Sequence, residues 1–479
     1  MAEDLAPLNA ADAATAAGLH DRFGFLRDVV AEMERRVPYA AAMVRSRQGL
    51  RFELRDAEQD TGRLDPQDGI VLTASTGHGL EEASTDHLDP DSIRRLADEL
   101  TERAASYRPM PDEPALEIAV PQGEDRDYAT VAEVDPAGLP LSEKLARFEE
   151  LRRQLRARDQ RSVQAIARYA EQSLQQVVVN RSTFATQQVR RVQLLMALVV
   201  SDGQQQRYGF IIRGATGGLE HLDIGPDELA RSADSAVAML GADPMPPGTY
   251  DVVTDCLTSG VIAHEAFGHG VETDMFLKER ARAADYVGKR VGSELVNIID
   301  DPTVPGAYGS YFVDDEGLPS ARTQIIRDGV FERGLTDLYS ATRLGIDRSA
   351  NGRRESVHRK AYARMSNTFF TPGESTRDEL LASLDSGFLV GDTLSGMEDP
   401  KGWGMQLSAQ WAKEYRNGQP TGRIFSPVAL TGYVPDVLAN VTMVSRDFGL
   451  DPGSCGKGWK EMVPVSSGGP YLRTRCRLG

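Results

Sequence analysis

Residues 259–270 of the chain read SGVIAHEAFGHG. A His-Glu pair followed by a second His is typical of metallopeptidase helices, in which two imidazoles bind zinc and the Glu takes a proton from the attacking water. The positions concerned are His264, Glu265 and His269. Their neighbours are mostly apolar, which predicts a helix packed into a core. Three polar side chains would be costly to bury there without a partner, and a metal ion supplies one.

The spacing of the two histidines departs from the usual pattern. Side chains four positions apart lie about 40° apart on one helix face, whereas five positions separate them by roughly 140°. Two imidazoles at that separation on a straight helix could not share one ion. Gly268 stands directly before His269, and glycine adopts left-handed or bulged backbone at little steric cost. We therefore expect the helix to end or bulge at Gly268, which brings His269 back beside His264.

The surrounding sequence predicts a β-rich domain. A strand over Tyr250–Thr254 leads into the helix, and hairpin signals follow at residues 315–317 (DEG), 328–329 (DG) and 417–418 (NG). A further helix is expected over Pro435–Phe448, and Gly-rich loop and strand over residues 450–479. We assign residues 243–479 to a barrel-like or twisted-sheet C-terminal metallopeptidase domain that carries the metal-binding helix.

The N-terminal half shows an α/β pattern. Apolar residues at helical spacing predict helices over residues 21–36, 93–107, 141–158 and 226–240. Short apolar or alternating runs predict strands over residues 40–45, 50–55, 71–74, 176–180, 184–187, 189–200 and 207–213. The Asp202-Gly203 pair predicts a hairpin between the last two strands.

Two proline-rich breaks divide the chain, at residues 109–114 and 243–248. We place an N-terminal α/β region at residues 1–242, with a sub-boundary near 109–114, ahead of the C-terminal domain at 243–479. The predicted fold class is therefore α+β.

The bulk composition narrows the function classes. The formal net charge is −17 over 479 residues, and a surface this acidic repels phosphate backbones and anionic lipid, so no nucleic-acid or membrane role is expected. No run approaches the roughly 20 apolar residues of a membrane-spanning helix, and the N-terminus lacks the pattern of an export signal. The odd number of cysteines, three, argues against a disulfide framework. These features predict a cytoplasmic protein.

Residues 264–274 read HEAFGHGVETD and resemble the signature of the TldD subunit in the TldD/PmbA (TldD–TldE) metalloprotease family. That family combines a His-Glu-x-x-x-His element with a late Cys, which here is Cys455 within GSCGK at 453–457. The resemblance is clear across the C-terminal half and mostly architectural in the N-terminal half. It implies a Zn²⁺ ion held by His264, His269 and Cys455, with Glu265 as the catalytic base; thiolate is a normal zinc donor.

One position departs from the family pattern. A Gly-Gln pair is expected after Cys-Gly-Lys, but Trp459 stands in place of the Gln, so substrate preference is expected to differ while metal ligation survives. Lys457 and Lys460 are expected to favour the ionised thiol. Glu272 and Asp274 have two readings of equal weight: acceptors that orient a ligating imidazole, or a solvated acidic turn.

The resemblance also implies a partner and a substrate class. A TldD-type catalytic subunit pairs with a TldE/PmbA-type subunit that lacks the metal motif, although a homodimer stays open. Extended or unfolded peptides, leader peptides among them, would bind as an added strand. Two other functions stay open: a metal-dependent amide hydrolase that releases a small product from a carrier or precursor, and a non-catalytic subunit of a heterodimeric protease.

Overall fold

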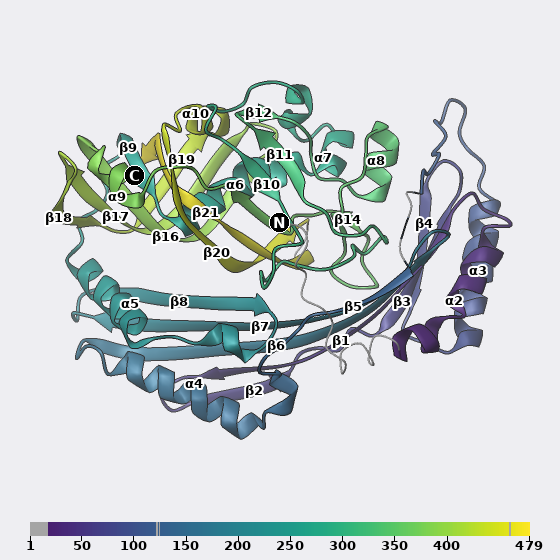
Figure 1. Cartoon of the computed structure of the whole chain (residues 1–479), viewed down its shortest axis with the longest axis horizontal. Helices are drawn as coiled ribbons and strands as arrows, with labels where there is room; N and C mark the ends of the chain where they lie inside the picture. The colour runs from purple at the N-terminus through teal and green to yellow at the C-terminus, as the bar shows by residue number, and fades with distance from the viewer. Residues whose placement is uncertain (1–17, 121–122, 124, 459–460) are drawn as a thin grey trace.

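Two β-sheets form the framework of the computed structural model, which describes residues 18–120, 123, 125–458 and 461–479. The first eight strands of the chain make one sheet, and most later strands make a second, 11-stranded sheet (Figure 1). Helices accompany both, so the expected α+β class is confirmed. None of the described helices is long and apolar enough to cross a membrane. The division into domains 1–242 and 243–479 stays a prediction.

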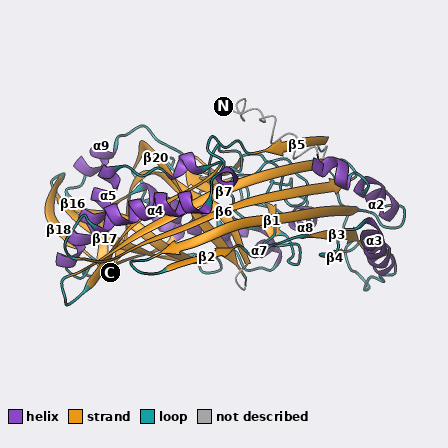
Figure 2. Ribbon diagram, turned by 90° about the horizontal axis from the view of Figure 1, so that it is seen from below, coloured by secondary structure: helices purple, strands orange, loops and turns teal. Residues whose placement is uncertain are grey.

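Long antiparallel strands dominate the N-terminal sheet and run along much of the molecule (Figure 2). The strand order is β4-β3-β1-β6-β7-β5, with β2 beside β1 and β8 beside β7. The bounds are β1 (Ala40–Leu54), β2 (Gln59–Arg63), β3 (Gly69–Ser75), β4 (Leu80–Thr85), β5 (Asp125–Ala129), β6 (Ser162–Asn180), β7 (Phe184–Ser201) and β8 (Gln206–Thr216).

Two expected strand breaks are absent from this sheet. The runs at 40–45 and 50–55 belong to one strand, β1, and those at 184–187 and 189–200 to another, β7. The polar residues between the runs stay in the ladder because they pair with β6 along nearly their whole length. The predicted turn at 202–203 does connect β7 to β8.

Two pairs of helices cover this sheet, at the positions that the apolar spacing predicts. The bounds are α2 (Leu26–Met33), α3 (Pro90–Ala105), α4 (Leu141–Arg156) and α5 (Pro226–Ala238). The Asp89 side chain caps α3 by accepting from the Ser92 N–H. Helices α2 and α3 share a core with β1, β3 and β6, whereas α4 and α5 pack on the other end of the sheet against β6, β7 and β8.

Five strands of the second sheet close into a barrel. The strand order is β21-β19-β17-β16-β9, and β9 pairs with β21 to close the ring. Of the two shapes expected for this domain, barrel-like or twisted sheet, these strands form the barrel. The remaining strands extend it: β12, β11, β10 and β15 continue from β21, while β18 pairs with β17 and β20 with β21. The bounds are β9 (Gly248–Thr254), β10 (Ile298–Asp300), β11 (Thr323–Arg327), β12 (Val330–Phe331), β15 (Asn367–Phe370), β16 (Ser386–Asp399), β17 (Gly404–Arg416), β18 (Gln419–Phe425), β19 (Val428–Tyr433), β20 (Met443–Lys457) and β21 (Glu461–Leu478).

Short helices and one small ribbon fill the loops of this half. They are α6 (Cys256–Phe267), α7 (Thr273–Leu277), α8 (Leu338–Leu344), α9 (Arg377–Ala382), α10 (Val434–Ala439) and the ribbon β13 (Gly352–Arg353) with β14 (Tyr362–Ala363). Single 3-10 turns are η1 (Pro136–Gly138), η2 (Leu219–Leu222), η3 (Met239–Gly241), η4 (His269–Val271) and η5 (Arg282–Tyr286).

The C-terminal end differs from the sequence-based expectation. The helix expected over Pro435–Phe448 ends at Ala439, and β20 begins at Met443. Residues 450–479, expected as loop and strand, belong mainly to the paired strands β20 and β21. Residues 443–448 pair with residues 470–473 of β21, and this pairing outweighs the local helical pattern.

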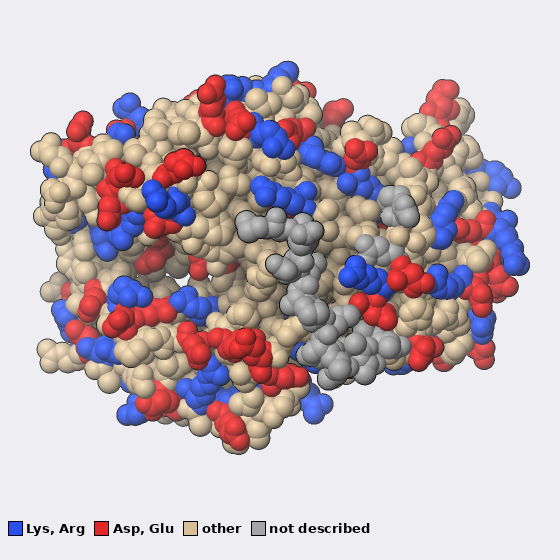
Figure 3. Space-filling model, viewed as in Figure 1, with Lys and Arg blue, Asp and Glu red and all other residues tan. Residues whose placement is uncertain are grey.

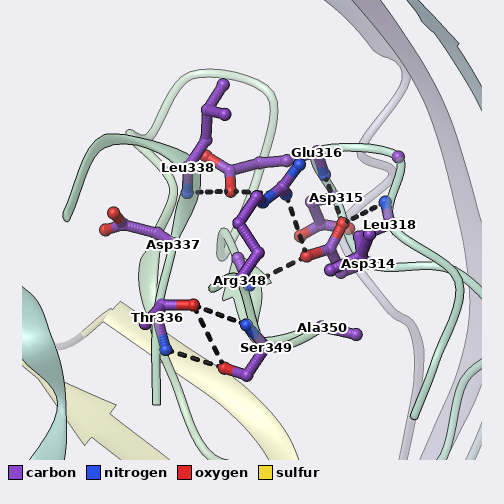
Figure 4. Close-up of polar contacts among 12 residues, drawn as sticks. Asp314, Asp315, Glu316, Leu318, Thr336, Asp337, Leu338, Arg348, Ser349 and Ala350 are labelled. Atoms are coloured by element: carbon purple, nitrogen blue, oxygen red, sulfur yellow. Dashed lines mark hydrogen bonds and ion pairs between the residues drawn. The ribbon is translucent and has the colours of Figure 1, made fainter. Parts of the chain in front are cut away.

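The predicted turns at 328–329 and 417–418 join β11 to β12 and β17 to β18. The DEG sequence at 315–317 does make a turn, but only an isolated bridge, Val313 to Pro319, flanks it. Its acidic side chains point inward, where Arg348 lies 3.5 Å from Asp314 and 3.3 Å from Glu316 (Figure 4).

This turn joins the two halves of the molecule. Asp315 accepts hydrogen bonds from Arg45 of β1 at 2.6 Å and from Gln176 of β6 at 2.8 Å. On its other side it accepts from the Arg354 N–H at 2.7 Å. A buried carboxylate with three donors is well satisfied, so Asp315 fixes the C-terminal half against the first sheet.

Glu316 makes the stability of this junction depend on pH. The pKa of Glu316 is raised to about 8, mainly because its carboxyl group is buried. Arg348 opposes this rise, whereas the nearby acids Asp337 and Asp314 add to it. The folded protein therefore holds a proton that the unfolded chain releases, so the free energy of unfolding should fall as pH rises from about 5 to about 8 and then level off.

In the wild type, the thermal unfolding midpoint should fall as pH rises from about 5 to about 8. In Glu316→Gln this fall should be smaller, because glutamine does not titrate, and calorimetry measures the midpoint at each pH. Glu294→Gln is the control, because that side chain is 83% exposed, and it should keep the wild-type profile. An unchanged slope in Glu316→Gln would contradict the assignment.

Candidate metal centre

Helix α6 carries the first histidine and lies between β21 and β16. The Asp255 side chain caps its N-terminus by accepting from the Thr258 N–H at 2.7 Å. Ile262 and Phe267 are at most 1% exposed and enter the core of the C-terminal half. Burial of each contributes about 2 kcal/mol, so packing holds α6 firmly and fixes the direction in which His264 and Glu265 point.

The helix ends at Phe267, as the sequence predicts, and Gly268 turns the chain into the 3-10 turn η4. The reason differs from the expected one, because Gly268 has φ −106° and is not left-handed. It is needed for space: a Cβ there would overlap both Met365 Sδ and the His264 carbonyl oxygen. Glycine therefore allows the chain to fold back closely over the last turn of α6.

The break brings the two imidazoles together and places them beside the late cysteine. The rings of His264 and His269 lie 5.1 Å apart, edge to face. Cys455, on β20, places its Sγ 3.4 Å from His269 Nε2. One donor atom from each of the three residues lies within 4.8 Å of the others. Both imidazoles and the thiol therefore converge on one point.

The thiol of Cys455 and the imidazole of His269 shift the pKa values of one another. Burial disfavours the thiolate, but the neighbouring imidazoles His269 and His264 outweigh it and hold the pKa of Cys455 well below its usual value. Burial also opposes the imidazolium, yet Cys455 and Glu272 hold the pKa of His269 well above its usual value. The protein thus stabilises a thiolate next to a positive charge.

The residues fit a zinc ion. Two imidazoles and a thiolate are common zinc donors, and His264 Nδ1 is buried without a hydrogen-bond partner among the described residues. His269 Nδ1 lies 3.3 Å from Glu272 Oε2, which leaves its Nε2 directed at Cys455. A carboxylate behind a histidine in this way fixes the ring and its tautomer in metal sites.

Glu272 and Asp274 take different parts. Glu272 contacts His269 directly, and its side chain is 2% exposed, so it is not a solvated acid. Burial would raise the pKa of Glu272, but Lys457 and His269 outweigh this and hold it at about 2. Asp274 instead pairs with Lys457 and Lys278.

Lys457 acts on the site through Glu272. Its Nζ lies 2.9 Å from Glu272 Oε2 and donates to the Ala363 carbonyl at 3.1 Å. We expected Lys457 to favour the thiolate directly, but in the structure it forms an ion pair with Glu272. Lys460 and Trp459, the position of the departure from the family pattern, lie outside the described residues.

An open cleft of about 680 Å³ reaches the three donors. Glu265 lines it beside them and lies against Gly396 of β16, where a Cβ would come within 2.9 Å of Glu265 Oε1. Glu398, two residues further along β16, lines the same cleft, and no sequence pattern indicated it. Burial raises the pKa of Glu398 to about 9. His269 opposes this rise, and Glu265 adds to it.

The remaining cysteines lie apart from this group, and burial raises the pKa of both Cys256 and Cys476 to about 12. None of the other described histidines joins a cluster of metal-binding side chains.

Comparison with known proteins agrees with this fold. Residues 247–476 match the model of the PmbA/TldA metallopeptidase C-terminal domain. A metalloprotease of Methanothermobacter thermautotrophicus is 37% identical over 289 residues, 60% of this chain and 62% of that protein. A metalloprotease TldD homolog of Haemophilus influenzae is 28% identical over 453 residues, 92% of each chain. The match spans less than two thirds of two of the archaeal relatives, 62% and 63% of their lengths.

Solved structures share the whole fold. TldE from Thermococcus kodakarensis superposes with a TM-score of 0.73 at 15% identity, over 94% of this chain and 99% of that one. A Thermotoga maritima protein, described as a candidate modulator of a DNA gyrase, gives 0.75 at 19% identity over 95% and 99%. Fold and sequence together define a protein with a metallopeptidase-type C-terminal domain. Through residues 247–476 and these relatives, the chain is similar to the TldD/PmbA family.

Replacing Gly268 by alanine tests the break in α6. The added methyl group overlaps Met365 and the His264 carbonyl, so the two imidazoles should separate and zinc affinity should fall by about tenfold or more. Bound zinc per chain after dialysis against a weak chelator measures this. Gly241→Ala is the control, since its Cβ meets nothing within 4 Å. Full zinc retention in Gly268→Ala would show that the close approach is not needed.

Removing one donor should abolish tight binding. Cys455→Ala leaves two imidazoles for the ion, so stoichiometric zinc should be lost, as it should in His264→Ala. Elemental analysis of the purified chain provides the measurement. Cys476→Ala, which removes a buried thiol outside the cluster, should keep zinc. Equal zinc in Cys455→Ala and wild type would remove the thiol from the ligand set.

Proposed function

We propose that the protein is a zinc-dependent peptidase whose metal is held by His264, His269 and Cys455. One observation carries the proposal: the three donor atoms lie within 4.8 Å of one another in the wall of an open cleft that Glu265 also lines. Metalloprotease names among the relatives support the same class of reaction.

The metal and the carboxylate of Glu265 have different roles in the proposed reaction. Zinc, when bound, supplies a Lewis acid that polarises a peptide carbonyl and acidifies water. Glu265 accepts a proton from the attacking water and returns it to the leaving amine, as a general base and then a general acid. Glu265 is 8% exposed and lines the wall of the cleft. Its carboxylate can therefore meet water, while its backbone stays in the packed helix α6.

The edge of β16 supplies a binding surface for extended peptides. Within the part of the chain that the structure describes, only residues 387–390 of β16 pair with β9, and beyond them the ladder continues on the β17 side alone. Residues 394–398, on this free edge, line the cleft. An extended peptide can add to such an edge through its backbone hydrogen bonds, whereas a folded domain whose backbone groups are already paired offers none. Unfolded peptides and leader peptides are therefore the proposed substrates.

The proposed assembly is a heterodimer with a TldE/PmbA-type subunit that lacks the metal motif, or a homodimer, and the proposed location is the cytoplasm. Nucleic acid and membrane are not proposed partners. Acidic and basic side chains are interspersed over the face in Figure 3, where neither sign forms a continuous patch.

The Glu265→Gln variant separates chemistry from metal binding. Because the amide keeps the size of the carboxylate but cannot accept the proton, zinc content should stay unchanged while hydrolysis of an unfolded peptide falls by about a hundredfold or more. Elemental analysis and a fluorogenic peptide assay give the two readouts. Normal turnover by this variant would exclude Glu265 as the base. A wild-type chain that binds no zinc and does not respond to a chelator would favour a non-catalytic subunit.

A further inference from the structure

A cavity of about 70 Å³ lies at the junction between the first sheet and the C-terminal half, and it shares no lining residue with the metal cleft. Strands β1 and β7 supply Arg45, Arg47 and Arg191 to its lining, and the ribbon strand β13 supplies Arg353. An open pocket of about 500 Å³ adjoins it, because Gln172 and Arg191 line both. The cavity has room for one small ion or for several waters.

Three of its arginines, Arg47, Arg191 and Arg353, form no ion pair with a carboxylate of the described chain. Arg191 and Arg353 are only 3% and 7% exposed, and Arg47 Nε is buried without a hydrogen-bond partner among the described residues. Burial and the neighbouring Arg353 lower the pKa of Arg191 to about 10. Their acceptors include main-chain carbonyls, which carry no net charge: Tyr308 and Ser310 for Arg191, Met365 and Pro464 for Arg353, and Asp65 for Arg47.

The charges that line the cavity do not cancel. Five arginines line it, against the three carboxylates of Asp314, Asp315 and Glu355. Arg45 pairs with Asp315 at 2.6 Å. Burial raises the pKa of Asp314 to about 6, so this carboxyl group is still ionised at neutral pH. The lining therefore keeps two positive charges in excess.

Charged groups behind the lining do not remove this excess, because the two signs are balanced there. They are the acids Glu82 and Asp300 and the arginines Arg348 and Arg364. Glu316, which also contacts Arg348, holds its proton at neutral pH because its pKa is about 8. Asp65 and Arg359 add one charge of each sign at exposed positions, where water and salt screen them. The adjoining pocket is balanced as well, by Arg63 and Arg190 with Asp68 and Asp135, and by Lys144 with Glu171.

We propose that this cavity binds a divalent tetrahedral oxyanion, a phosphate or sulfate group, between the arginines of the two halves. A dianion offsets both excess charges, whereas a single carboxylate would leave one of them. The planar guanidinium fork suits such an ion, since it offers paired donors to neighbouring oxygens. The ion would connect Arg47 and Arg191 of the first sheet to Arg353 of the C-terminal half and so stabilise the junction. The site lies apart from the metal cleft, and the proposal does not depend on the peptidase function.

Thermal unfolding of the full-length, zinc-loaded chain tests the site, with sodium sulfate compared against sodium chloride at equal ionic strength. Sulfate also stabilises folded proteins in general by exclusion from their surface, so the informative quantity is the difference between variants. Arg47→Gln removes one unpaired guanidinium at a partly exposed position. It should weaken sulfate binding by about tenfold or more and lose most of the sulfate-specific rise in the unfolding midpoint.

Arg63→Gln is the matched control. It removes the same charge from an exposed residue that lines only the adjoining pocket, so it should keep the wild-type response to sulfate. Arg191→Lys keeps the charge but loses the fork, and it should weaken binding as Arg47→Gln does. An equal sulfate response in wild type, Arg47→Gln and Arg191→Lys would overturn the proposal.

A crystal of the wild type soaked in selenate locates the ion without any variant. Its anomalous signal should lie between Arg47, Arg191 and Arg353, and a soaked crystal with no signal there would overturn the proposal. Titration calorimetry then separates the sources of the group. Binding of glycerol 2-phosphate more tightly than inorganic phosphate, and sensitive to Arg47→Gln, would identify a phosphate ester that extends into the adjoining pocket, and the reverse order would identify the free ion. Acetate binding as tightly as sulfate would overturn the assignment to a dianion.

Discussion

The close approach of the chain to itself at Gly268 is the constraint on which the candidate metal centre depends. A regular helix would direct His264 and His269 to different sides of α6. The chain instead ends the helix at Phe267 and packs the next turn against the His264 carbonyl and Met365, in a space that admits no side chain. Since α6 is fixed by its buried core face, the position of His269 follows from this one contact.

A second set of contacts brings the thiol to the two imidazoles across a long stretch of sequence. Cys455 lies on β20, and its carbonyl accepts from the buried guanidinium of Arg364 at 2.6 Å. The same arginine lies 3.8 Å from Glu272, the carboxylate behind His269. Lys457 contacts that carboxylate from β20 as well. Two cations thus share one buried carboxylate; removing it would leave Arg364 without its ion pair at high cost, whereas Lys457 would keep Asp274.

Much of the candidate site was predictable because its residues belong to short sequence motifs. His264, Glu265 and His269 stand within six residues, and the need for a break follows from helix geometry alone. The exact cause of the break was not predictable, because it depends on Met365, about a hundred residues away. Glu398 is invisible to sequence reasoning for the same reason. Only the folded β16 places it beside Gly270.

The fold shows the same division between local and non-local signals. Helices α3, α4 and α5 were predictable because each carries apolar residues at helical spacing. The expected helix at 435–448 failed in its second half, where pairing with β21 decides the structure. The DEG turn was visible as a turn, whereas the inward direction of its carboxylates depends on Arg45 and Arg348, which belong to distant segments.

The junction at Asp315 and the metal centre are connected through one short stretch of chain. Arg354, whose N–H donates to Asp315, also pairs with Glu82 of β4. A few residues further on, Ala363 donates to Asp337 and accepts from Lys457, and Arg364 donates to the Cys455 carbonyl. Residues 352–364 therefore contact the first sheet at one end and the support of the thiol at the other. Because these contacts are buried and charged, movement of one half of the molecule against the other would disturb the metal ligands, so the first sheet contributes to the geometry of a site that it does not line.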